Sequence, residues 1–309
     1  MITMSDINLL KLYYGDPYQI DDNIIIYQPT IGEIIDYGEF EFFNMLYMFV
    51  GNTTFHRLKL WLIGVDWNKI SDYELFCKTV PALHVDQTRI LFGDLDFSKY
   101  ELMEVSLPSE PEKLKTAEEE LLEQDKPKKT HSQKRKEAFE LYEKTHTLFD
   151  RSSGEEISAE TYHSIVNVLR EMTHIYPKTE YANGKTTKEF IISEEKDKLK
   201  KDLAQSMSSP TSSLQPLISS CVNHSGFKYN ISESRSLTFA QLMDSVDRLQ
   251  VIESTHALLG GMYSGFCDTS KIPKNQFDFT RSLNQDSGKV SKDTKGKTEQ
   301  QQKKKIIGG

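Results

Sequence analysis

The sequence has few of the features that mark secreted, membrane-bound or nucleic-acid-binding proteins. Its three cysteines, Cys77, Cys221 and Cys267, are odd in number and far apart, which predicts buried thiols in a reducing compartment and no disulfide framework. No basic segment followed by an apolar core opens the chain, and its most apolar run, residues 42–50, is far shorter than the ~20 residues of a membrane span. The formal net charge of −8 offers no basic face for DNA or RNA. We therefore expect a cytoplasmic protein that binds neither membranes nor nucleic acid.

The sequence also lacks a complete phosphate-binding or calcium-binding motif. Residues 184–187 read Gly-Lys-Thr-Thr like the end of a P-loop, but Thr179 stands where the first glycine of that motif belongs. The run from Asp94 to Ser98 begins like a calcium loop, yet Lys99 replaces the required glycine and the closing glutamate is missing. A turn is the better interpretation of residues 94–98, and a two-residue hairpin turn is the better interpretation of Asn183-Gly184.

A carboxylate-bridged di-metal enzyme is a remote alternative suggested by two Glu-x-x-His pairs. Glu171 with His174 and Glu253 with His256 both fall on predicted helices, where helical bundles hold two irons. Helical spacing predicts that Glu253 and His256 lie near an apolar stripe while Glu171 and His174 point away from theirs. The two pairs are therefore not expected to form one site, and a hydrogen-bonded core histidine is the simpler expectation for His256.

No nucleophile with its base can be identified either. Cys221 and His224 are three residues apart with no third group to orient them, so structural roles are expected for both. We assign no catalytic, cofactor-binding or metal-binding residue, and the sequence predicts a protein that is not an enzyme.

What the sequence does contain is two dense apolar blocks separated by charged segments. We expect an α+β, mainly α-helical fold with a small N-terminal antiparallel sheet, a helical bundle and a charged linker. The predicted domains are an N-terminal α+β block at 1–107, a charged linker or insertion at 108–149, a C-terminal helical block with a hairpin at 150–281, and a disordered tail at 282–309.

The N-terminal block begins with a hairpin over residues 18–27, since two apolar runs flank Asp21, Asp22 and Asn23. Thr30 with Glu33 forms a capping box that predicts one helix over 31–50. The remaining expected elements are a helix over 55–62 capped by Thr53 or Thr54, a helix over 72–79 capped by Ser71, and strands over 89–97 and 100–107 that pair with the hairpin.

In the C-terminal block, Ser158 is expected to cap a helix with the apolar stripe Tyr162, Ile165, Val166, Leu169 and Met172. The turn at Asn183-Gly184 is expected to join strands over 176–181 and 186–192. Two further helices are expected, one over 214–223 and one from the capping box of Thr238 and Gln241 to Gly260 and Gly261.

Six segments together resemble a family of tail-module proteins of siphovirus-like tailed phages of Gram-positive hosts. They lie outside the charged insertion and the tail, and are residues 27–40 (YQPTIGEIIDYGEF), 64–76 (GVDWNKISDYELF), 91–99 (LFGDLDFSK), 223–229 (NHSGFKY), 243–250 (MDSVDRLQ) and 261–265 (GMYSG).

The resemblance implies a tail assembly chaperone, a protein without catalytic residues that works in virion morphogenesis. Such a protein binds the tape measure protein in the host cytoplasm. It can also contact the tail tube protein and form a homo-oligomer. The alternative interpretation is a structural component of the virion, either a tail or a connector subunit. Such a subunit would need a large symmetric interface.

Overall fold

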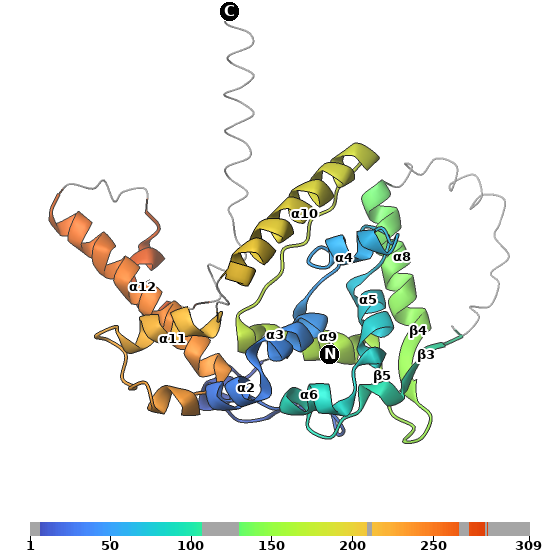
Figure 1. Ribbon diagram of the computed structural model, residues 1–309, viewed down its shortest axis with the longest axis horizontal. Helices are drawn as coiled ribbons and strands as arrows, with labels where there is room; N and C mark the ends of the chain where they lie inside the picture. Colours follow the sequence, from blue (N-terminus) through green and yellow to red (C-terminus); the bar gives the residue numbers. More distant parts are fainter. Residues whose placement is uncertain (1–6, 107–129, 209–211, 266–271, 282, 284–309) are drawn as a thin grey trace, which may run out of the picture. The chain divides into compact units, whose positions relative to one another are not determined.

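The protein has an α+β fold that is mainly α-helical, as predicted. The computed structural model describes residues 7–106, 130–208, 212–265, 272–281 and 283 (Figure 1). Cys267 and the predicted tail after residue 283 lie outside the described residues. Cys77 and Cys221 are both buried, as expected.

The chain forms two compact units that are not consecutive in sequence. Unit 1 comprises residues 1–216 and 235–241, and unit 2 comprises residues 217–234 and 242–309. The chain therefore passes from one unit to the other three times. The helices α11 (Leu214–Val222) and α12 (Phe239–Tyr263) each contribute residues to both units.

Unit 1 opens with a short helix and the predicted hairpin. Helix α1 (Leu9–Tyr14) is followed by β1 (Tyr18–Gln19) and β2 (Ile25–Ile26), which pair antiparallel. The Oδ1 atom of Asp21 accepts hydrogen bonds from the backbone amides of Asn23 and Ile24 and so closes the turn. The hairpin is confirmed, with shorter strands than expected.

The single helix expected over 31–50 is wrong, because the chain breaks it at Gly38. Helix α2 (Ile31–Tyr37) begins at the predicted capping box of Thr30 and Glu33, and α3 (Glu39–Val50) follows. Gly38 has φ = 111°, a conformation that only glycine adopts at little cost. The apolar pattern continues across the break, so periodicity alone does not reveal it.

Helix α3 lies at the centre of the core of unit 1. It packs against α5 (Asp72–Thr79), α6 (Val85–Phe92) and α9 (Ala159–Thr173). The ring of Phe49 lies 4.8 Å from that of Phe92 and 6.1 Å from that of Phe76, and Phe76 lies 4.8 Å from Tyr162. Helices α5 and α9 begin at Ser71 and Ser158, as predicted, and the predicted stripe of α9 is buried.

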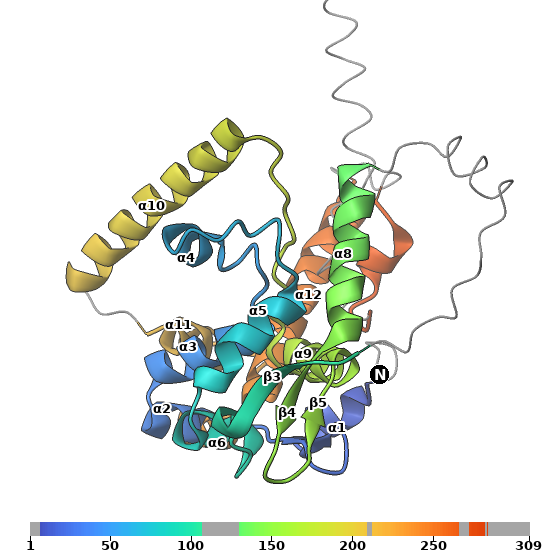
Figure 2. The same cartoon turned by 90° about the vertical axis from the view of Figure 1, so that its right-hand side faces the viewer.

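The second sheet corrects the strand assignment around residues 89–107. Residues 89–92 belong to α6, because a short apolar run fits a buried helix as well as a strand. Strand β3 (Tyr100–Glu104) is confirmed, but it pairs with β4 (His146–Asp150) and not with the hairpin. Strand β5 (Glu156–Ile157) completes the antiparallel sheet, and helix α8 (His131–Thr145) leads directly into β4 (Figure 2).

The expected hairpin around Asn183-Gly184 is also wrong. Gly184 has φ = 90° and immediately precedes the long helix α10 (Lys185–Ser208), which packs on α4 (Arg57–Leu62). Helix α4 has His56 at its N-cap position, where Thr53 or Thr54 was expected. A small core of Leu60, Trp67, Ile70, Leu75, Ala182 and Ile192 lies beneath α10.

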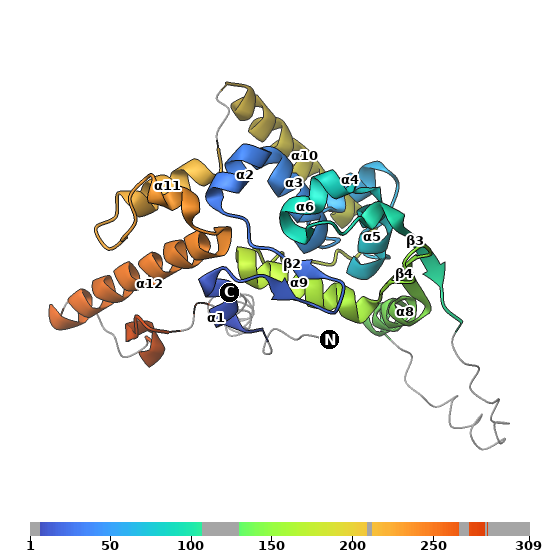
Figure 3. The same cartoon turned by 90° about the horizontal axis from the view of Figure 1, so that it is seen from below.

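In unit 2, the segment after α12 folds back along this helix (Figure 3). Arg248 donates to the backbone oxygens of Phe279 (2.8 Å) and Arg281 (3.0 Å), and the Thr255 hydroxyl donates to that of Gln276 (3.2 Å). The buried guanidinium of Arg281 donates to the Thr255 hydroxyl in turn. Helix α12 starts at the predicted capping box of Thr238, but it runs through the two glycines that were expected to end it.

Candidate functional site

Unit 1 carries an open pocket of about 570 Å³ between α2, the chain that leads into it, and α6. We call it the α2–α6 pocket. Its apolar walls are formed mainly by Tyr27, Pro29, Tyr37 and Ile90. Tyr27 and Pro29 precede α2, Tyr37 is its last residue, and Ile90 lies on α6.

Two hydrogen bonds and one glycine fix the walls of this pocket. The amide of Tyr27 donates to the carbonyl of Leu91 (2.7 Å), and the Tyr37 hydroxyl donates to the carbonyl of Gln87 (2.9 Å). Gly93 has φ = 61°, and a Cβ atom at this position would lie 2.9 Å from the Tyr27 ring. Residues 27–40 and 91–99, two of the six segments singled out in the sequence, therefore meet at this pocket.

The rim of the α2–α6 pocket is acidic. Three carboxylates, those of Glu33, Asp36 and Asp86, line it with one guanidinium, that of Arg89. Arg89 pairs with Asp94 outside the lining (2.9 Å), so its charge is already balanced. The surplus of negative charge makes this a site for a neutral or cationic ligand.

Two of the three carboxylates also have structural contacts. Asp36 pairs with Arg235 (3.0 Å), which belongs to the later segment of unit 1, residues 235–241. Glu33 accepts from the amide and hydroxyl of Thr30 in the capping box. Asp86 is exposed in the first turn of α6 and forms no ion pair with a described residue.

Gln28 adds a polar side chain to the lining. Its Nε2 atom donates to the carbonyls of Asp16 (2.7 Å) and Lys11 (3.4 Å), which fixes the orientation of the amide. The Oε1 atom is buried and has no hydrogen-bond partner among the described residues. A buried oxygen without a partner lowers the stability of the folded chain.

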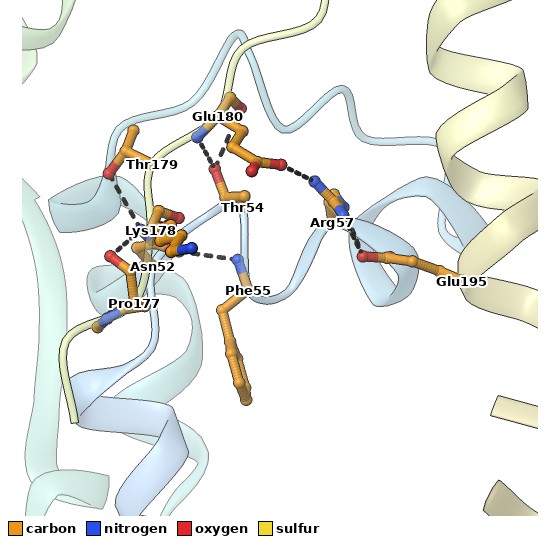
Figure 4. Close-up of polar contacts among 9 residues, drawn as sticks. All are labelled: Asn52, Thr54, Phe55, Arg57, Pro177, Lys178, Thr179, Glu180 and Glu195. Atoms are coloured by element: carbon orange, nitrogen blue, oxygen red, sulfur yellow. Dashed lines mark hydrogen bonds and ion pairs between the residues drawn. The ribbon is translucent and has the colours of Figure 1, made fainter. Parts of the chain in front are cut away.

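A second polar cluster in unit 1 holds the segment before α10 in place (Figure 4). Asn52 is fully buried, and its Nδ2 atom lies within hydrogen-bonding distance of the carbonyls of Pro177 and Lys178 and the hydroxyl of Thr179 (3.4, 3.1 and 3.1 Å). Its Oδ1 atom accepts from the amide of Phe55 (2.8 Å). The Asn52 side chain thus forms hydrogen bonds with residues 177–179 and also with the segment that leads into α4.

Neighbouring contacts extend this cluster to α10. The Thr54 hydroxyl accepts from the amide of Glu180 (3.0 Å), and Arg57 bridges the carboxylates of Glu180 and Glu195 at 2.9 and 2.6 Å (Figure 4). These groups pair with one another, so the cluster positions α10 and does not present free groups to a ligand. Its residues lie about 125 positions apart in the sequence, which is why sequence patterns did not reveal it.

The side chains of the two Glu-x-x-His pairs lie in different environments. Glu171 is buried on α9, so the expectation that it points away from the core is wrong. His174 ends that helix with φ = 55°. His256 is exposed on α12, so the expected core histidine is also wrong. Within the described residues, no group of three or more His, Cys, Asp or Glu side chains is placed to hold a metal ion.

His224 has a partner that the sequence did not indicate. Its Nε2 atom lies 3.2 Å from a carboxylate oxygen of Glu253, which is the glutamate of the second Glu-x-x-His pair. Cys221 is buried, and burial raises the pKa of its thiol, which keeps the thiol protonated and unreactive. The contact between His224 and Glu253 holds the end of α11 to α12 within unit 2.

The two rejected binding motifs have structural roles. Lys185 lies in the first turn of α10 and pairs with Glu189 on the same helix (3.8 Å). Asp96 caps a short 3₁₀ helix, and hydrogen bonds from Ser98 lower the pKa of its carboxyl group. The turn expected at residues 94–98 is confirmed, although it joins a helix to a strand.

Part of the chain is similar to a known protein family. Residues 205–282 match the YomV second domain. This is a phage-derived protein family, and the match indicates a phage protein. The matched segment runs from the end of α10 through α11 and α12 to the folded-back segment that ends near Arg281. Searches of curated proteins and of solved structures gave no match.

None of the helices within the described residues is long and apolar enough to cross a membrane.

Proposed function

We propose that this phage protein acts without catalysis as a tail assembly chaperone that binds the tape measure protein. The observation that carries the proposal is the α2–α6 pocket, where two sequence segments that resemble the tail-module family meet. The pocket is open, has aromatic and proline walls, and carries an acidic rim. These features suit the binding of a polypeptide segment.

Exposed apolar residues beside the pocket support a protein-binding role. Leu9, Leu10, Tyr13 and Tyr14 on α1 are between 50% and 72% exposed, and Gly15 at the end of this helix lines the pocket. Contiguous apolar surface of this kind commonly marks an interaction site. A tape measure protein offers long apolar helices, and weak repeated contacts can cover them and still be displaced when tube subunits assemble.

Two experiments test the proposal together. Mature virions of the phage that encodes this chain are analysed by quantitative mass spectrometry, with the tube protein as the stoichiometric reference. The same chain is co-expressed with the tape measure protein, and soluble tape measure protein is measured with and without it. A chaperone is absent from virions and increases the soluble fraction. Stoichiometric presence in virions would instead identify a tail or connector subunit.

A further inference from the structure

We propose that the α2–α6 pocket recognises a short segment of the partner that carries lysine or arginine. The ammonium or guanidinium group lies between Glu33 and Asp86, and its aliphatic stem packs against the tyrosine walls. This inference rests on the proposed function, because it names the chemistry through which the partner protein is bound.

The charges of the pocket favour a cation. Arg89 is paired with Asp94 and Asp36 is paired with Arg235, so these two lining charges are already compensated. Glu33 and Asp86 remain as the uncompensated pair on the rim, one from α2 and one from α6. An approaching anion is repelled by this pair, whereas a lysine or arginine gains two favourable interactions.

The walls of the pocket are suited to the stem and to the charged head of such a side chain. Tyr27 is 41% exposed, and its ring is held against Gly93. Tyr37 is held by its hydrogen bond to Gln87, and burial raises the pKa of its phenol, so it presents a neutral ring. Cations bind the faces of such rings, and rings that are already fixed lose little entropy on binding.

The size of the pocket favours a peptide segment. A volume of about 570 Å³ accommodates a few side chains, which is the extent of a short segment and not of a whole helix.

The test measures binding of a short fluorescein-labelled peptide that alternates lysine with leucine to the full chain, by fluorescence anisotropy. The reference probe is the same peptide with glutamine in place of lysine. We expect the lysine peptide to bind more tightly and its affinity to fall as salt is added. The double variant Glu33→Gln/Asp86→Asn should bind about tenfold more weakly, since each exposed charge contributes about threefold.

A matched control removes the same net charge elsewhere. Glu101→Gln/Glu104→Gln acts on strand β3, outside the pocket lining, and should leave the affinity unchanged. An equal loss in both double variants would overturn the proposal, because the peptide would then respond to net charge alone. Peptide binding that occurs only after deletion of residues 284–309 would also overturn it, since this lysine-rich segment would then be the occupant in place of a partner.

Co-purification of the tape measure protein with the same variants separates the two proposals. Loss of both peptide binding and co-purification in Glu33→Gln/Asp86→Asn supports both. Co-purification that survives the loss of peptide binding overturns the pocket as the partner site and leaves the proposed function intact. Peptide binding without any co-purification by the unmodified chain supports the chemistry of the pocket and removes the proposed partner.

Discussion

A buried histidine at the start of α4 makes the stability of unit 1 depend on pH. The Nε2 atom of His56 donates to the carbonyl of Tyr47 (3.0 Å), which the neutral imidazole can do while its other nitrogen stays unprotonated. Burial lowers the pKa of His56 below its ordinary value of 6.5. The unfolded chain therefore binds more protons than the folded chain between the lowered pKa and 6.5.

Because of this difference, we predict that His56 contributes stability above pH 6.5 that is lost as the pH falls through the lowered pKa. Urea unfolding monitored by circular dichroism at several pH values gives the slope of the unfolding free energy. The variant His56→Gln should have a smaller slope than the unmodified chain. His256→Gln, which replaces an exposed histidine in unit 2, is the control.

A single glycine also fixes one wall of the α2–α6 pocket. The variant Gly93→Ala adds a Cβ atom at φ = 61° and 2.9 Å from the Tyr27 ring, so we predict a loss of about 1–3 kcal/mol in the free energy of unfolding. It should also weaken binding of the lysine peptide, since the ring must move. Gly154→Ala has a similar φ of 78° with nothing within 4 Å. This control should lose stability without losing affinity; equal affinities in both variants would show that Tyr27 is not a wall of the binding site.

Local sequence signals predicted the helix caps at Thr30, Ser71, Ser158 and Thr238 because each cap depends on residues within one turn. The burial of Glu171 and His56 and the exposure of His256 are set by elements that are distant in sequence, so helical spacing could not predict them. The pocket was missed for the same reason, although two of the segments that form it had been singled out by resemblance.

At the scale of elements, the Asn52 cluster decides how α10 is attached. Asn52→Ala removes the amide that bonds residues 177–179 and the acceptor for the Phe55 amide. We therefore predict a loss of about 1–3 kcal/mol in the free energy of unfolding and release of residues 177–179. Limited trypsin digestion should cut faster after Lys178 in the variant. Asn44→Ala on the exposed side of α3 is the control. Unchanged cleavage after Lys178 in Asn52→Ala would mean that other contacts hold the segment.

The same cluster explains why the hairpin predicted where α10 begins does not form. Asn183-Gly184 is a strong local turn signal, and flanking aromatic and apolar residues favour strands. In the structure, residues 177–180 make their hydrogen bonds to Asn52 and Thr54 instead, and a helix follows Gly184.

Strand β4 was missed because only five residues form it and two of its polar residues, Thr147 and Asp150, are buried.

At the scale of the whole molecule, unit 1 depends on a segment that follows part of unit 2 in the chain. The carbonyl of Pro29 accepts from the amide of Phe239 (3.0 Å), and the amide of Ile31 donates to the carbonyl of Leu237 (2.8 Å). We predict that a chain truncated after residue 216 is less stable than one truncated after residue 241, which retains this segment. Thermal unfolding of the two chains measures the difference, with truncation after residue 283 as the reference. Equal melting temperatures for the two shorter chains would contradict the prediction.

This interleaved connectivity has a consequence for inheritance. A single recombination breakpoint near residue 216 would separate residues 1–216 from the segment at 235–241 that completes their fold. The two parts then have to come from parent proteins whose surfaces at Pro29 and Leu237 are already complementary. Among genomes that exchange this gene in blocks, recombination breakpoints should therefore be found outside residues 7–241 more often than within them. Variation within this stretch should instead accumulate by point substitution.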